Sequence, residues 1–456
     1  TDTAAYFLTW KLTTETGKRM ANSSLNDFNG LSPQTYHLNE IIQLGTSDYS
    51  PGLKFGTDAS FTLADYDSGE GWTGNFVSKG GNKQFNFTLA NYGSGPDPYL
   101  EVVLVGGNTL DHNVDILVGP SQTSLRTIGN MQFSDRNAYR QVFSFLPTDV
   151  GAGGALSVRL NVVGFDGAAD RVSTALVRVV YPQTMSMTSS ENKVFYLDEL
   201  EAAERAYFRV TTTNAAGTQV YEITDPLNPV RITTTSFSDR LECLIPGPYT
   251  SRKVLTVTSP LTVADIDAVT MTSPNVSSDY LIITHPALRA PASDGLDPVQ
   301  AFATYRASVQ GGAYTSTILN IFDVYNQFNY GDVSPLAVKQ MADYALATGT
   351  PKALLLIGKG RTPDYNFYRN NQHSVINIPT YGEPGGDLMF TKGLGASDVK
   401  PALAVSRINA YTVEHVKAYL DKVKEMEQIP YADLFRKNVL QLSGGQSVSE
   451  LTIFRG

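Results

Sequence analysis

The chain has 456 residues, a formal net charge of −9 at pH 7 and a single cysteine. The acidic balance and the lack of a basic run argue against nucleic-acid binding, and no apolar stretch approaches the roughly 18 residues of a membrane-spanning helix. One cysteine excludes an intrachain disulfide and a cysteine-based zinc site. With 42% hydrophobic and 17% charged residues, the chain can bury sizeable cores, and its length predicts roughly two to four domains.

The first part of the chain, residues 1–190, is predicted to be a β-sandwich-like region. Short alternating or apolar segments such as YLEVVLVGG and ALSVRLNVVG are separated by clusters of Gly, Asp, Asn and Pro. A helical period is suggested only near Leu38–Leu44. The opening TDTAAYFLTW is typical of a strand and not of a signal peptide, so we expect the chain to begin inside a longer precursor.

Residues 191–275 are predicted to form a small second β-rich domain, with strands in KVFYLDEL, RAYFRVTTT and TQVYEITDP. A short helix could continue through AERAYF. The only cysteine, Cys243, alternates with apolar neighbours in DRLECLIPGPY, which favours a buried small hydrophobic residue. A catalytic thiol is the alternative, but no Gly-rich turn or nearby His accompanies it.

After Pro274 the pattern changes to strands that alternate with helices. Asp297, Ser334 and Thr412 each precede an expected helix and can cap its first turn. The segment after the strand in YTSTILN is expected to be irregular. The strands are predicted in SDYLIITH, YTSTILN, KALLLIG, PALAVSRI and RKNVLQLSGG. This order predicts a mostly parallel sheet with helices on its faces, and all strand C-terminal ends on one edge.

Candidate functional residues gather at that edge, where open α/β sheets place their sites. A long loop begins there at Gly358 and ends near Lys400, and loops beyond roughly 12–15 residues are usually functional. It contains Asp387 and Asp398, each beside glycine or small residues. These carboxylates could orient a His, receive a cationic substrate group or bind calcium with loop carbonyls. An Asx turn is the structural alternative for each.

Other polar groups at the edge have structural interpretations. The GKG at residues 358–360 lacks the Gly-Lys-Ser/Thr of a phosphate loop and is predicted to be a tight turn. His285 has no Gly-x-Ser-x-Gly nucleophile to pair with, so a hydrogen-bonding role is favoured over catalysis. His373 has no second ligand at metal-binding spacing. Ser443, Gly444 and Gly445, at the end of the last predicted strand, are also expected at this edge.

The order of these motifs resembles the gingipain-type cysteine peptidase family, and within it the sortase-like members of the type IX secretion system. The resemblance rests on YEITDPLNPVRI, DYLIITH, KALLLIGKG, IPTYG, VSRINA and NVLQLSGG. Ser406–Arg407 stands where many members have Gly-Arg, a mild departure. The resemblance implies that residues 276–456 are the front part of an incomplete caspase/gingipain-like α/β peptidase domain.

Members of this family use a Cys–His pair, and neither of its two motifs occurs in this chain. The roles are therefore not assigned to Cys243 or to any His, and we expect this chain alone to lack nucleophile and base. By motif order, Asp387 matches an acid that orients the catalytic His, and Asp398 matches an acid that lines the substrate pocket. No cofactor is implied, although structural calcium stays an alternative.

The resemblance implies a function for the whole protein. It would be a secreted or cell-surface enzyme, at the outer membrane, that cleaves sorting domains from cargo proteins and can pass the acyl group to an amine. Its expected partners are protein cargo substrates, secretion-system components and the remaining C-terminal polypeptide of the same precursor. A catalytically inactive secreted binding or adhesion module is the alternative, and a proteolytically nicked product is a third.

Overall fold

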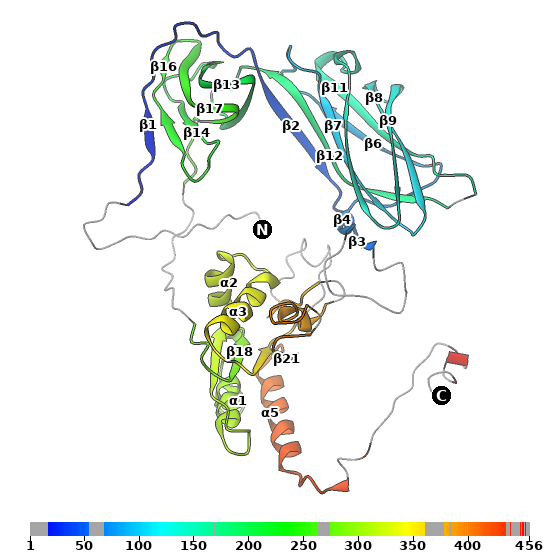
Figure 1. The fold of residues 1–456 in the computed structure, drawn as a ribbon, viewed down its shortest axis with the longest axis vertical. Coiled ribbons are helices and arrows are strands. Elements are labelled where there is room, and N and C mark those ends of the chain that lie inside the picture. The colour runs from blue at the N-terminus through cyan, green and yellow to red at the C-terminus, as the bar shows by residue number, and fades with distance from the viewer. Residues whose placement is uncertain are drawn as a thin grey trace. The chain divides into compact units, whose positions relative to one another are not determined.

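The computed structural model describes residues 17–53, 68–167, 169–262, 274–360, 378–382, 385–398 and 400–434, with a few single residues after 434 (Figure 1). The chain divides into two compact units whose main boundary falls between residues 269 and 270. Over its described residues the first consists of strands with short 3-10 helices, and the second mixes strands and α-helices. The finer division at 190/191 and 275/276 stays a prediction. None of the described helices is long and apolar enough to span a membrane.

The first unit consists of mostly antiparallel sheets. Its strands are β1 (Ala21–Ser23), β2 (Tyr36–Leu44), β3 (Asp48–Pro51), β4 (Glu70–Thr73), β5 (Val77–Ser78), β6 (Asn82–Thr88), β7 (Tyr99–Gly106), β8 (Asp111–Ser121), β9 (Ser124–Ser134), β10 (Ala138–Ser144), β11 (Ala155–Val162), β12 (Arg171–Thr184), β13 (Lys193–Thr211), β14 (Gln219–Glu222), β15 (Val230–Ile232), β16 (Thr235–Ser236) and β17 (Arg240–Val257). Short 3-10 helices η2 (Pro147–Asp149) and η3 (Ala152–Gly154) precede β11. The strands β1 and β15 form a parallel pair.

The large sheet of this unit has the strand order β1-β15-β14-β17-β13-β2-β12-β7-β10. In the sandwich, the smaller sheet β6-β11-β8-β9 packs against the part of the large sheet that runs β2-β12-β7-β10. Period-two burial explains the packing: Val114, Ile116 and Val118 of β8 are fully buried, and the residues between them face outward. These side chains share one core with residues of β7 and β12. The predicted β-sandwich is confirmed.

Two segments for which the sequence left a helix open are strands in the structure. Residues 38–44 lie in β2, which pairs with β12 from Tyr36↔Thr184 to Leu44↔Leu176. AERAYF lies within β13, which pairs with β17 along most of its length. In both cases long-range pairing outweighs a weak local helical period, because strand preference depends mainly on cross-strand packing.

In the large sheet, β2 lies between β12 of the sandwich and β13 of the strands that follow it in the chain, and His37 is at this junction. Its neighbour Leu38 pairs with Tyr196 of β13, while β12 lies on the other side. The ring is fully buried, and its Nδ1 lies 3.0 Å from the carbonyl oxygen of Leu38. Burial, with the charge of Lys193, lowers the pKa of His37 from 6.5 to about 4. A neutral imidazole is therefore part of the folded junction.

We expect this histidine to make the first unit less stable in acid. The folded-state pKa is below the unfolded value, so the unfolded chain binds the proton first. The contribution of His37 is complete above pH 6.5 and is lost as the pH falls to about 4, by up to roughly 3 kcal/mol. Urea unfolding of wild type and His37→Gln between these pH values checks this. A variant with the same loss of stability in acid would contradict it.

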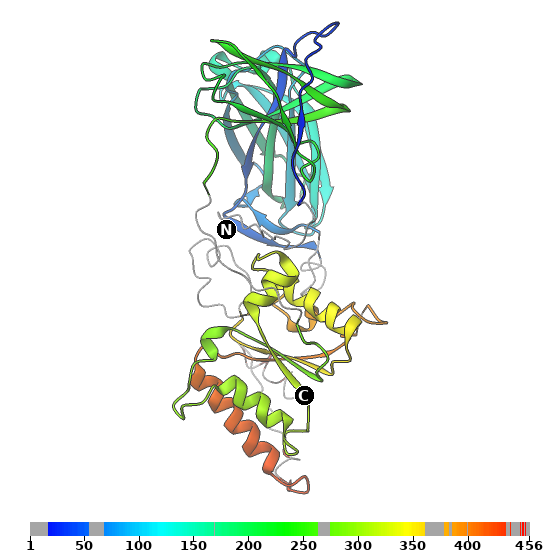
Figure 2. The ribbon, with the colours of Figure 1, turned by 90° about the vertical axis from the view of Figure 1, so that its left-hand side faces the viewer.

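The second unit is an α/β layer structure (Figures 1 and 2). Its strands and helices are β18 (Tyr280–Thr284), η4 (Pro286–Leu288), α1 (Pro298–Ala307), β19 (Ser316–Asn320), α2 (Ile321–Asn329), α3 (Pro335–Thr348), β20 (Ala353–Ile357), η6 (Asp387–Phe390), β21 (Ala404–Ile408) and α5 (Val413–Gln428). The sheet has the order β19-β18-β20-β21, and every pair is parallel. The predicted mostly parallel α/β fold is confirmed.

Helices cover both faces of this sheet, which explains why β18 and β20 are almost continuously apolar. On one face α1 and α5 share a core with Ile282, Leu355 and Ile408. Figure 2 shows α2 and α3 on the opposite face. Buried residues on both sides of each central strand follow from this arrangement.

The predicted helix caps are confirmed. The side chains of Asp297, Ser334 and Thr412 each accept a hydrogen bond from a backbone N–H in the first turn of α1, α3 and α5. The segment after β19 was predicted to be irregular, and this is wrong. Asn320 accepts a hydrogen bond from the Phe322 N–H at 3.0 Å and begins α2 directly at the strand end. The sequence shows no break there because the strand residue itself is the cap.

Candidate functional site

The C-terminal ends of the four parallel strands meet at one edge, as predicted. Thr284 pairs with Asn320 on one side and Ile357 on the other, and Ile357 pairs with Ile408. The residues that follow each strand therefore lie along a single line. The Gly358 N–H donates to the carbonyl of Ile408 at 3.0 Å and continues the ladder past the strand end.

Arg407, near the end of β21, is the centre of this edge. Its Nε and Nη2 donate to the two carboxylate oxygens of Asp387 at 2.7 and 2.8 Å. Nη1 donates to the carbonyls of Gly358 and Ile378 at 2.8 and 3.0 Å, and Nη2 also donates to that of Pro379 at 2.9 Å. The guanidinium thus uses its full donor capacity in a planar fork.

These contacts attach the later part of the long loop to the sheet. They join residues 378–379 and η6 to the ends of β20 and β21. Only 10% of the Arg407 side chain is exposed, against 23% for Asp387. A Cβ atom at Gly360 would lie 3.0 Å from the guanidinium carbon of Arg407, so the chain passes closely here. We call Arg407, Asp387 and the three carbonyl-bearing residues 358, 378 and 379 the Arg407 clamp.

Asp387, predicted to orient a catalytic His, has both carboxylate oxygens bound by Arg407. The orienting role stays a prediction, because no imidazole is bonded to Asp387 in the part of the loop that the structure describes. Asp398, predicted to line a substrate pocket, is exposed on the turn before β21. Among the described contacts, no side chain is bonded to both Asp387 and Asp398. The role of Asp398 therefore also stays a prediction.

His285 has a local structural role, as its sequence context favoured. Its Nδ1 accepts a hydrogen bond from the Ala287 N–H at 3.1 Å and caps η4. The ring lies edge-on against Phe322, with centroids 5.1 Å apart. Burial lowers the pKa of His285, so the neutral ring that can accept this bond is favoured. The predictions on His373, Ser443, Gly444 and Gly445 fall outside the described residues.

Cys243 is part of the core of the second β region, as predicted. It lies on β17 opposite Phe208, is 1% exposed and packs among apolar side chains. Burial strongly raises the pKa of the thiol. A thiolate is the reactive form of cysteine, so this residue cannot serve as a nucleophile in the folded chain.

The burial of Cys243 predicts slow alkylation. Iodoacetamide should modify the folded chain at pH 8 at least roughly a hundredfold more slowly than the chain in urea, because reaction requires unfolding of the core. Mass spectrometry over time gives both rates. Rapid modification of the folded chain would show that the thiol is accessible.

The structure also bears on metal binding. Over the described ranges, no group of three or more His, Cys, Asp or Glu side chains is close enough to hold a metal ion. Asp387 pairs with a cation of the protein itself. The calcium alternative therefore has no support from this carboxylate, whose oxygens are both engaged.

Comparison with known proteins identifies the second unit. Residues 273–454 match Peptidase family C25. The resemblance to gingipain-type peptidases is confirmed for this segment. The C25 segment includes the parallel sheet and the Arg407 clamp. No curated protein sequence matches the chain.

A solved structure is similar over nearly the whole chain. It is the crystal structure of dimeric latent PorU from Porphyromonas gingivalis, with 14% identity and a TM-score of 0.60, covering 89% of this chain. The similar region is 39% of that chain, so this chain spans well under half of its length. At this identity the likeness establishes the fold, including the β regions that precede the C25 segment.

Carbohydrate-binding modules also match, over much less of the chain. A CBM36 module in complex with calcium and xylotriose covers 24% of this chain at 16% identity, with a TM-score of 0.18. A CBM36-1 domain of a xylanase from the hindgut metagenome of Trinervitermes trinervoides covers 31% at 16% identity, with a TM-score of 0.20. Scores this low do not support a functional argument.

Sequence reasoning singled out Asp387 but missed its partner. Arg407 was noted only for the Ser-Arg pair that departs from the family pattern. A signal was available, because Arg407 is a charged residue inside the apolar strand AVSRI, one residue before its end. An arginine in such a position must find acceptors, and a carboxylate in the preceding loop is the natural one.

Proposed function

We propose that the chain is the N-terminal part of a secreted gingipain-like cysteine peptidase that cleaves sorting domains from cargo proteins of a type IX secretion system. One observation carries the proposal. The chain has β regions followed by a C25 segment, and the solved chain of latent PorU has a similar fold over 89% of this chain, across both parts. The motif order of residues 276–456, which resembles the sortase-like members, supports the finer assignment.

The chemistry requires groups that this chain does not offer. A thiolate attacks the scissile carbonyl carbon, the C–N bond breaks, and an imidazolium gives its proton to the leaving amine. Water then hydrolyses the resulting thioester, or an amine attacks it and forms a new amide. Cys243 cannot supply the thiolate because it is buried in the core. In our proposal the reacting thiol and imidazole belong to polypeptide beyond residue 456.

In this proposal the C-terminal edge of the parallel sheet, with the Arg407 clamp, positions catalytic groups and does not supply them. The Arg407 clamp fixes the loop that carries Asp387 against the strand ends. Residues held this way can position a neighbouring catalytic group, because a carboxylate with a fixed orientation loses little freedom when it binds one. The proposed partners are cargo proteins, secretion-system components and the rest of the same polypeptide. The proposed location is the cell surface.

The test uses the longer protein that includes these 456 residues and a reporter that carries a C-terminal sorting domain. Mass spectrometry should show cleavage at one boundary, and added glycine amide should appear on part of the new C-terminus. A peptidyl acyloxymethyl ketone should abolish cleavage and label a cysteine other than Cys243. Cys243→Ser is the matched control and should cleave at the wild-type rate.

The opposite result has a clear meaning. If the longer protein cleaves no reporter and the electrophile labels no cysteine, the peptidase assignment is wrong. The binding or adhesion module would then be the better description. Labelling confined to Cys243 with loss of cleavage would overturn the structural assignment of that residue.

A further inference from the structure

The parallel sheet of the C25 segment has an edge strand, β19, with one neighbour among the described strands. The Tyr280 N–H donates to the Thr315 carbonyl at 2.9 Å, and this bond sets the alternation along β19. Residues 315, 317 and 319 direct their backbone groups to β18. Ser316 and Ile318 therefore direct their N–H and C=O groups away from the sheet.

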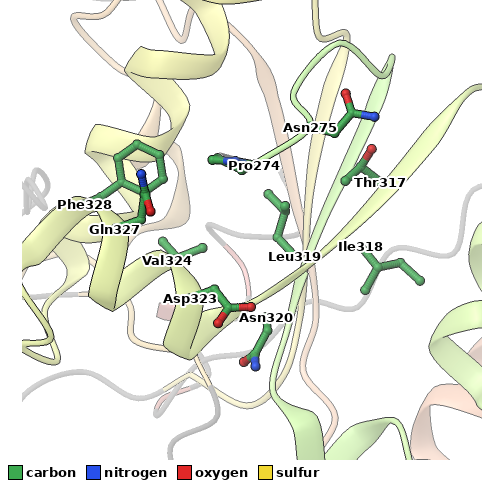
Figure 3. A pocket seen from close by; sticks show the side chains of 10 residues that line it. All are labelled: Pro274, Asn275, Thr317, Ile318, Leu319, Asn320, Asp323, Val324, Gln327 and Phe328. Carbon is green, nitrogen blue, oxygen red and sulfur yellow. The ribbon is translucent and has the colours of Figure 1, made fainter. Parts of the chain in front are cut away.

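A pocket follows this edge. It has a volume of about 210 Å³ and lies between β19, α2 and the residues that lead into the unit (Figure 3). Its apolar lining comes from Pro274, Ile318, Leu319, Val324 and Phe328. Figure 3 shows Leu319 directed toward α2 and Ile318 on the other side of the strand. The space thus runs beside the backbone of β19, with room for an apolar side chain of an adjoining strand.

The chemistry of the edge indicates its occupant. Outward N–H and C=O groups at every second residue match the backbone of an extended polypeptide, which can add a strand and place alternate side chains in pockets. The pocket lining includes one charged group, the exposed carboxylate of Asp323, and no Lys, Arg or His. A basic residue near the apolar anchor would complement it.

We propose that β19 and this pocket form a docking site for an extended segment of a protein substrate, bound by strand addition. The segment places an aliphatic or aromatic side chain in the pocket and a Lys or Arg beside Asp323. The identity of the segment as substrate rests on the proposed function. Binding can be measured on this chain without any catalytic activity, because every residue of the site belongs to the chain.

The first test measures binding to the 456-residue chain by fluorescence anisotropy. The probe is a short fluorescein-labelled peptide of alternating Thr and Leu with one Lys. Two further versions carry N-methyl groups on alternate residues, each blocking one edge of the peptide. The version methylated on the docking edge should bind roughly tenfold more weakly, and the other should bind like the parent. Equal binding of both versions would overturn strand addition.

Variants of the chain give the second test. Ile318→Pro removes an outward N–H while leaving the bonds to β18, since edge strands tolerate proline. It should weaken the parent peptide roughly tenfold, and the control Ile318→Val should not. If Ile318→Pro fails to fold, Asp323→Lys gives the same test. This variant should bind the Lys-containing peptide more weakly, and its affinity for a peptide with Gln in place of that Lys should equal that of the wild type. Wild-type affinity in both Ile318→Pro and Asp323→Lys would reject the site.

Two outcomes separate this inference from others. Sedimentation that shows a dimer lost in Ile318→Pro, with no peptide binding, would assign the edge to a second copy of the chain and overturn the proposal. Peptide binding in a protein that cleaves no reporter would leave the docking site standing and remove the proposed function.

Discussion

Replacing Arg407 with methionine is expected to lower the free energy of unfolding of the α/β unit by about 3 kcal/mol. The substitution leaves a partly buried carboxylate and three carbonyls without their common donor, and removal of one partner of such a pair typically costs about 3–5 kcal/mol. The lower value is expected because Asp387 is 23% exposed and regains some hydration. Urea unfolding and amide hydrogen exchange measure the effect, with faster exchange expected at Ile378 and Met389.

Two comparisons make this result specific. Arg289 also forms an ion pair with a carboxylate, that of Asp297, but the arginine side chain is 42% exposed. Arg289→Met should therefore cost less than about 1 kcal/mol. Arg407→Lys should have an intermediate effect, because it keeps the charge and loses the planar fork. If Arg407→Met costs no more than Arg289→Met, the clamp does not hold the loop.

His112 is expected to be equally important for the β-sandwich. Its Nδ1 lies 2.6 Å from Oδ1 of Asp170, and Nε2 lies 2.9 Å from the carbonyl oxygen of Asp135. The His112 and Asp170 side chains are both fully buried. Asp170 also accepts from the Asn113 N–H at 3.0 Å. The ring therefore connects β8 with two chain segments that are distant in sequence.

We expect His112→Leu to cost about 3–5 kcal/mol of unfolding free energy, because it leaves the Asp170 carboxylate buried and without its partner. The double variant His112→Leu, Asp170→Leu should recover part of this loss, since it removes the isolated charge. Asp111→Asn, at the exposed neighbouring position, is the control and should stay within about 0.5 kcal/mol. Urea unfolding followed by circular dichroism gives all three values. A double variant worse than the single one would show that packing, not charge, dominates.

Much of the fold could be predicted because its determinants are local. The alternation in β8, the apolar runs of β18 and β20, and the caps at Asp297, Ser334 and Thr412 each act within a few residues. Local signals of this kind set the type of each element and the order of strands and helices. The motif order then indicated the gingipain-type family for the α/β unit.

One error falls where a distant segment decides the local structure, and another where a single residue both ends a strand and caps a helix. Residues 38–44 show a weak helical period, yet they form a strand because β12 offers nine residues of pairing. The helix α2 begins without a separate linker, so the strand signal conceals it. For residues 38–44 a weak local preference gives way to hydrogen bonding and packing that the local pattern does not contain. For α2 the cause is local, because Asn320 both ends β19 and caps the helix.

The candidate site shows the same division. Composition and spacing were enough to exclude a disulfide within this chain, to predict that Cys243 is buried and to point to the edge where the long loop begins. They could not show that Arg407 holds Asp387, or that β19 offers backbone groups beside a pocket. Those facts depend on how strands far apart in the chain are ordered and registered in the sheet. That order results from burial of the whole apolar surface, which no short segment specifies alone.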